Sequence, residues 1–205
     1  MNNMKEITYN IEFFSDWHCG SGLAAGADVD ALVVKDKDGL PFVPGKTIKG
    51  LIKEAVDDIN QFSKKEDKVS EPDLKKAFGF FDKDSDKDNK EQGYLFFANA
   101  KLPKNERDTI VKNNAQKFFY RSIASTAIGK DGTADEHSLR KIQVTVPCTL
   151  QGKIVADKID SDIENIIITA FNYIKRLGQN RNRGLGRCKF THIQTKEVKN
   201  DDTEI

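Results

Sequence analysis

Two segments of the chain carry apolar side chains at helical spacing, and strand-like segments come before, between and after them. In 47–62 and in about 162–177 the apolar residues recur every three or four positions, which predicts two amphipathic helices. Alternation of apolar and polar residues predicts strands in 5–14 and 142–155, and a last strand is expected over 185–193. This order fits an α+β protein with a modified ferredoxin-like (RRM-like) β-α-β-β-α-β core and inserted loops.

The chain of 205 residues is long enough for one large domain or two small ones. We expect a single domain over 1–199, followed by a frayed tail at 200–205. The stretch 63–92 is charge-rich and poorly periodic, so it is expected to be an insertion before a short strand at 94–98. Residues 128–138 are rich in turn-forming side chains and are expected to be exposed.

Several protein classes do not fit the sequence. No apolar run approaches the roughly 18–20 residues that a membrane span needs, so no membrane partner is expected. The first ten residues lack the layout of a signal peptide. The three cysteines, Cys19, Cys148 and Cys188, lie far apart without a CxxC pair, which argues against a disulfide scaffold. We expect a reduced, cytoplasmic protein.

Charge is segregated along the chain although the totals nearly cancel, with 33 Lys and Arg residues against 32 Asp and Glu. No acidic residue lies between Glu164 and Glu197, and a second acid-free basic stretch runs from Asp108 to Asp131. Such segregation indicates a face that binds a polyanion. The first stretch holds seven basic residues: Lys175, Arg176, Arg181, Arg183, Arg187, Lys189 and Lys196.

The densest part of this stretch is Gly178-Gln-Asn-Arg-Asn-Arg-Gly-Leu-Gly-Arg187, the glycine-rich loop. Glycines let a main chain approach a phosphate closely, and arginines give it two-pronged hydrogen bonds. Lys46 and Lys49 lie at the start of the first predicted helix, where a helix N-terminus also favours phosphate. These residues predict contact with a nucleic-acid backbone. The alternatives are an ordinary basic loop and a solvated helix face.

Three segments near the N-terminus carry a resemblance when they are read together with the glycine-rich loop. They are Trp17–Gly22, Val29–Asp36 and Leu40–Gly50, which ends in a Pro-Gly-x-x-x-Lys-Gly turn. In this order they resemble the RAMP superfamily, the repeat-associated RNA-binding proteins of CRISPR systems. The resemblance covers most of 5–193.

Within the superfamily the chain is most similar to the repeating backbone subunits of type III effector complexes. The resemblance implies copies of the subunit stacked along a guide RNA, with a β-hairpin thumb at about 122–142 and other effector subunits as partners. It also implies that Asp30 cleaves complementary target RNA at regular intervals. The residues expected to bind RNA are His18, Lys46, Lys49, Lys53, Arg121, Arg140, Arg181, Arg183 and Arg187.

Asp30 needs a chemical role that suits a carboxylate. A free Asp has a pKa of about 3.9, so Asp30 is expected to be ionised and a weak base at neutral pH. A role in orienting the attacking 2′-hydroxyl, or in holding Mg²⁺ at the scissile phosphate, fits better. Asp28, two residues away, is expected to share or replace it. The alternative is a solvated carboxylate in a subunit that only holds RNA.

His18 offers a different hypothesis. A histidine in the first loop could be the general base of a nuclease that processes guide precursors. Such nucleases usually have two ferredoxin-like halves, and this sequence predicts one. His18 could instead pack near Trp17 or contact RNA. An RNA-binding protein of the ribosomal or tRNA type is a further alternative, against which the paired end motifs argue.

Overall fold

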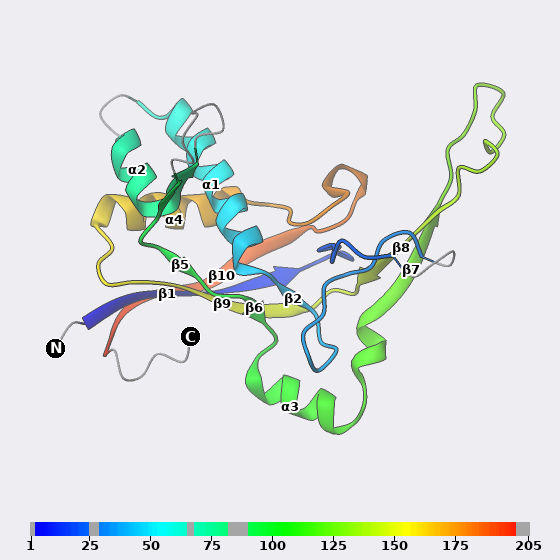
Figure 1. Cartoon of the computed structure of the whole chain (residues 1–205), viewed down its shortest axis with the longest axis horizontal. Coiled ribbons are helices and arrows are strands. Elements are labelled where there is room, and N and C mark those ends of the chain that lie inside the picture. The colour runs from blue at the N-terminus through cyan, green and yellow to red at the C-terminus, as the bar shows by residue number, and fades with distance from the viewer. Residues whose placement is uncertain (1–2, 25–28, 65–67, 82–89, 200–205) are drawn as a thin grey trace.

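The computed structural model describes residues 3–24, 29–64, 68–81 and 90–199. Its main feature is an antiparallel sheet in which the long first strand lies between the last strand and the strand that precedes the last helix (Figure 1). The strand order is β10-β1-β9-β6-β2, and β5 pairs with β9 beside β6. The bounds are β1 Asn3–Phe13, β2 Phe42–Val43, β5 Phe96–Phe97, β6 Ala100–Lys101, β9 Thr149–Ala156 and β10 Cys188–Lys199.

Helices cover one side of this sheet. The long helix α1 (Gly45–Phe62) packs against α4 (Ser161–Tyr173), with α2 (Glu71–Phe78) beside them, and α3 (Lys104–Lys112) lies on the other side (Figure 1). The six core elements in chain order are β1, α1, β5 with β6, β9, α4 and β10. When the four strands of this core are numbered 1 to 4 along the chain, their order across the sheet is 4-1-3-2. The predicted ferredoxin-like fold class is therefore confirmed.

The centre of the core is the helix-facing side of β1. Ile7, Tyr9 and Ile11 alternate along the strand and are at most 1% exposed. The Tyr9 ring lies 4.7 Å from the ring of Phe171 in α4 and 5.4 Å from that of Phe190 in β10. Each large apolar side chain buried in this way contributes about 1.5–3 kcal/mol. The aromatic cluster thus fixes α4 and β10 to the first strand.

Several predicted boundaries were wrong, and two of the differences have a local cause. The second helix ends at Tyr173 because Ile174 is extended, with φ −69° and ψ 120°, although Ile174 and Leu177 stay buried. The strand predicted over 142–155 is two strands, β8 (Arg140–Thr145) and β9. Pro147 lies at the break, and proline cannot donate to a sheet ladder.

The insertion predicted at 63–92 contains regular structure. Ser70 caps α2, with its hydroxyl accepting from the Asp73 N–H at 3.3 Å. A short hairpin follows, formed by β3 (Gly79–Phe81) and β4 (Lys90–Gln92). Parts of the predicted insertion, 65–67 and 82–89, and the predicted tail lie outside the described residues.

A second hairpin extends away from the body of the protein (Figure 1). It consists of β7 (Tyr120–Ser125) and β8, which pair with each other and form a sheet of their own. Val144 and Thr145 at the root of β8 are fully buried, whereas residues 126–137 are exposed or nearly so. The segment predicted as the thumb falls within this hairpin.

Among the described residues, no helix has the length and apolarity to cross a bilayer.

Candidate nucleic-acid interface

The glycine-rich loop folds back on itself between α4 and β10. Gly178, Gly184 and Gly186 have positive φ values of 97°, 88° and 69°. The Leu177 N–H donates to the Gly186 carbonyl at 2.8 Å, which closes the loop. A Cβ on Gly186 would lie 1.9 Å from the Leu177 carbonyl oxygen, so this position admits only glycine.

The loop presents its arginines to solvent. Arg183 and Arg187 are exposed, and neither forms an ion pair with a carboxylate of the described residues. Arg181 is partly engaged, since its Nη1 lies 3.7 Å from Oε2 of Glu54 in α1. Exposed pairs of this kind are weak, so a phosphate could replace Glu54. Of the three predicted phosphate ligands, Arg183 and Arg187 are thus the more available.

The loop is bonded to the segment that follows β1, residues 14–18, which we call the linker. The Phe14 N–H donates to the Arg187 carbonyl at 2.8 Å, and the Arg187 N–H donates to the Ser15 hydroxyl at 2.9 Å. The Gly186 N–H donates to the Asp16 carbonyl at 2.7 Å. These bonds fix where the loop lies relative to the end of β1.

The same linker is bonded to the root of the hairpin. Trp17 and Thr145 exchange two backbone hydrogen bonds, of 2.9 and 2.8 Å. The His18 Nδ1 lies 2.6 Å from the Gln143 carbonyl oxygen, and the His18 carbonyl accepts from the Gln179 N–H of the loop at 2.8 Å. Loop, linker and hairpin root therefore form one continuous unit.

Arg121 adds a charged bond to this unit. Its Nε donates to Oδ2 of Asp16 at 2.7 Å, and its guanidinium pairs with the same carboxylate through Nη2. The Asp16 side chain is 5% exposed, whereas that of Arg121 is 63% exposed. Arg121 was predicted to bind RNA, and the structure places part of its guanidinium on Asp16 with the remainder open to solvent. Nothing in the local sequence marks Asp16, because its partner is 105 residues away.

His18 is buried, with 1% of its surface exposed. Because Nδ1 faces a carbonyl oxygen, Nδ1 must carry a proton that it donates. Nε2 is also buried and has no hydrogen-bond partner among the described residues. A ring enclosed in this way connects the linker to the hairpin and does not reach the surface.

Asp30 lies beside the start of β8, at the end of the paired strands that is far from Thr145. Its N–H donates to the Lys141 carbonyl at 2.8 Å, and its Oδ2 accepts from the Lys141 N–H at 2.7 Å. Its Oδ1 lies 3.7 Å from Nη1 of Arg140, and the side chain is 46% exposed. The structure thus brings together two predicted site residues, Asp30 and Arg140. The other predicted catalytic residue, Asp28, lies outside the described residues.

Asp30 by itself offers a metal ion only one carboxylate. Within the described part of the chain there is no cluster of three or more His, Cys, Asp or Glu side chains that could hold a metal ion. Mg²⁺ at phosphoryl-transfer sites is commonly bound by one or two carboxylates together with substrate phosphates. Asp30 therefore fits a Mg²⁺ site only where bound RNA provides further oxygens.

A groove of about 1340 Å³ crosses the sheet next to the start of α1. Strand alternation turns several of its residues, such as Asn10 and Gln151, away from α1 and α4. Lys46 borders the groove, whereas Lys49 and Lys53 lie further along α1 and are half-buried. Its lining contains lysines, a histidine, amides and two exposed or half-exposed phenyl rings but no described carboxylate: Lys46, Lys101, Lys153, His192, Asn10, Asn99, Gln151, Gln194, Phe42 and Phe96.

The fold is shared with solved structures. The chain is similar to a chain of the type III-B Cmr-beta complex bound to cognate target RNA, solved by cryo-EM, with a TM-score of 0.63 and 12% sequence identity over 90% of this chain and 96% of that one. A chain of the apo state of type III-B Cmr-beta gives a TM-score of 0.60 and 12% identity, over 95% of this chain and 98% of that one. No curated protein matches the sequence.

The family is shown by the sequence itself. The model of the RAMP superfamily matches residues 10–189, which include the linker, the segment containing Asp30, the hairpin and the glycine-rich loop. The chain belongs to the RAMP superfamily.

Proposed function

We propose that this protein is an RNA-binding backbone subunit of a type III CRISPR effector complex, with a guide RNA, complementary target RNA, further copies of itself and other effector subunits as partners. The observation that carries the proposal is the bonding of the basic loop and the hairpin to one linker. A strand of RNA on this surface would meet phosphate ligands and a projecting hairpin at a fixed separation. The two similar structures, both of type III-B complexes, support this choice.

The loop would hold the guide through its phosphates. Arg183 and Arg187 give forked donors that match phosphate oxygens, and the flanking glycines leave room for the RNA backbone. Contacts of this kind are independent of sequence, which suits a subunit that has to accept any guide. The groove beside Lys46 has the cations and aromatic rings of a surface for unpaired nucleotides.

We further propose that the subunit cleaves target RNA at Asp30. In the in-line reaction the 2′-hydroxyl loses its proton and its oxygen attacks the adjacent phosphorus. The bond to the 5′ oxygen breaks, that oxygen gains a proton, and the products are a 2′,3′-cyclic phosphate and a 5′-hydroxyl. Asp30 would orient the 2′-hydroxyl from its place beside the start of β8. Mg²⁺, held jointly by Asp30 and the RNA, would neutralise charge on the phosphate.

A specific observation favours a second candidate, a subunit that holds RNA without cleaving it. The Asp30 carboxylate already accepts the Lys141 N–H and lies near Arg140, so it has a structural role at the start of β8. The processing-nuclease alternative receives no such support, because the His18 ring is buried.

Replacing Arg183 and Arg187 together by glutamine is expected to weaken guide binding and to flatten its salt dependence. Each lost phosphate contact lowers the slope of log affinity against log salt by about 0.7 for a single strand. The double variant should therefore lose about 1.4 from the slope, measured by titration with labelled RNA at several salt concentrations.

The matched control is the double variant Lys104→Gln/Lys112→Gln, which removes the same charge from exposed positions on α3. It should keep the wild-type slope. Equal losses in the two double variants would mean that net charge, and not the loop, binds the RNA.

A further inference from the structure

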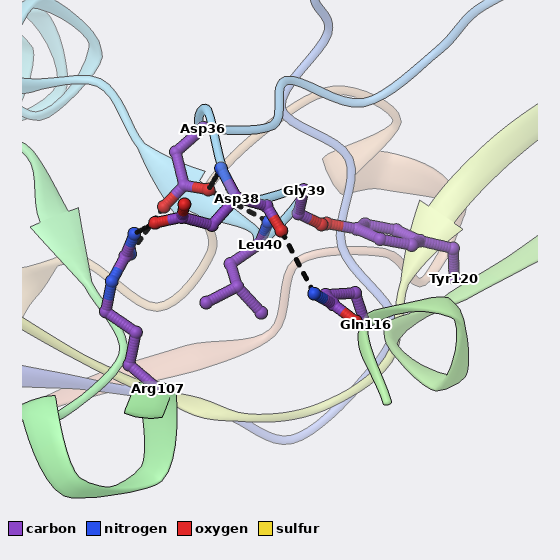
Figure 2. A network of polar contacts seen from close by, with 7 residues as sticks. All are labelled: Asp36, Asp38, Gly39, Leu40, Arg107, Gln116 and Tyr120. Carbon is purple, nitrogen blue, oxygen red and sulfur yellow. Dashed lines mark hydrogen bonds and ion pairs between the residues drawn. The ribbon is translucent and has the colours of Figure 1, made fainter. Parts of the chain in front are cut away.

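We propose that Arg107 is a positioning residue that sets the direction of the hairpin, acting through the turn at 36–40. The inference rests on the proposed function, because the hairpin's direction matters only if RNA lies against it. Figure 2 shows the network: Arg107 reaches from α3 to two carboxylates of the turn, and Gln116 and Tyr120 reach the same turn from the segment leading into the hairpin.

The first half of the network is a two-pronged ion pair. Nη1 of Arg107 donates to Oδ2 of Asp36 at 2.5 Å, and Nη2 pairs with Oδ2 of Asp38. The side chains of Arg107 and Asp36 are 20% and 12% exposed, so solvent screens this pair less than a surface pair. A guanidinium that bridges two carboxylates fixes both their distance and their direction.

Asp36 also holds the turn in shape. Its Oδ1 accepts the N–H groups of Asp38 and Leu40 at 2.9 and 3.0 Å. Partial burial raises the pKa of Asp36, but the hydrogen bonds from Arg107 and from these two N–H groups outweigh that effect and lower the pKa below its usual value. The carboxylate is therefore ionised at neutral pH, as the ion pair requires.

The second half of the network bonds the start of the hairpin to this turn. The Tyr120 hydroxyl donates to the Gly39 carbonyl at 2.8 Å, and Nε2 of Gln116 donates to the Asp38 carbonyl at 3.3 Å. Lys35 Nζ lies 4.0 Å above the Tyr120 ring. Burial and the nearby charge of Asp36 raise the pKa of Tyr120, so its hydroxyl keeps the proton that it donates.

The start of the hairpin is held mainly by polar contacts, because little of its apolar surface is buried. None of the residues of α3, of the 3₁₀ turn Gln116–Phe119 or of β7 is fully buried. The segment from 104 to 125 is held to the body by half-buried side chains, by strand β8, by the ion pair of Arg121 with Asp16 in the linker and by the network at the turn. The linker is also bonded to β8 at the hairpin root. Arg107 thus restrains the start of the hairpin from α3, through contacts separate from those of the linker.

The test measures the direction of the hairpin in the full chain without RNA. Spin labels at Lys130 near the hairpin tip and at Asn172 in α4, both exposed, report the distance between hairpin and body. The variants are Arg107→Gln and, as a matched control on the same helix, Lys112→Gln. We expect a shifted and broader distance distribution for Arg107→Gln and an unchanged one for Lys112→Gln. An unchanged distribution in Arg107→Gln would overturn the inference.

Two further measurements keep the outcome clear. Should Arg107→Gln fail to fold, Tyr120→Phe removes only the bond to Gly39 and should still broaden the distribution; a wild-type distribution in that variant would count against the network. Arg107→Lys retains the charge but loses the two-pronged geometry, and it should give a distance distribution of intermediate width. Broadening in Arg107→Gln, with no RNA bound by the wild-type protein, would reject the proposed function and leave the positioning role intact.

Discussion

Replacing Asp30 by asparagine is expected to slow cleavage of complementary RNA in the assembled complex by roughly 10²–10³-fold, the cost of removing one preorganised group that positions or stabilises the reacting atoms. Guide binding should be unchanged. Asparagine retains an oxygen that can accept the Lys141 N–H, so the anchor at the start of β8 is preserved while the negative charge is lost. The measurement is the rate at which evenly spaced products appear from labelled target in the presence of Mg²⁺.

The variant Asp30→Ala separates chemistry from structure, because it removes both the charge and the hydrogen-bond acceptor. If Asp30 is catalytic, the two variants should be equally slow. Full activity in Asp30→Asn with a loss only in Asp30→Ala would assign Asp30 a purely structural role. Intact target bound tightly by wild type and by both variants would identify the subunit as a scaffold.

The second large effect is expected from Gly186→Ala. A Cβ at this position would lie 1.9 Å from the Leu177 carbonyl oxygen, and the φ of 69° is unfavourable for alanine. The loop would have to open, which breaks its bonds to the linker, and we expect a loss of about 3 kcal/mol or more in the free energy of unfolding. Urea unfolding of the purified protein measures it.

Gly184→Ala is the matched control. Gly184 also has a positive φ, of 88°, but a Cβ there would meet no atom within 4 Å. Its cost should be limited to the conformational penalty of about 1–2 kcal/mol. Equal losses in the two variants would mean that backbone conformation, and not the close approach to Leu177, makes glycine necessary at 186.

The sequence predicts those parts of the fold that have a periodic pattern. The alternation around Tyr9 and the apolar stripe of α1 led to the correct strand and helix, and their order led to the fold class. The helix α3 was missed because it has no buried stripe: Ile110 and Val111 are its only apolar side chains, and both are half-buried. The end of α4 was misplaced because Leu177 continues the apolar spacing although the chain there is no longer helical.

The candidate site was also predictable only in part. The glycine-rich loop could be recognised because its glycines and arginines lie together in the sequence. The bonds that connect it to the hairpin could not, because Asp16 and Arg121, or His18 and Gln143, are more than a hundred residues apart. The burial of His18 follows from these long-range contacts, since a histidine beside glycines in the sequence looks exposed.

Nuclease protection of a bound guide RNA tests the central proposal most directly. The protein would be co-expressed with a guide, purified with the RNA it retains and treated with nuclease, beside the Arg183→Gln/Arg187→Gln variant. If copies of this subunit stack along the guide, wild type should protect fragments whose lengths rise in equal steps, and the variant should lose the protection. Unprotected RNA with the wild-type protein, or protection without a regular step, would contradict a repeating RNA-binding backbone.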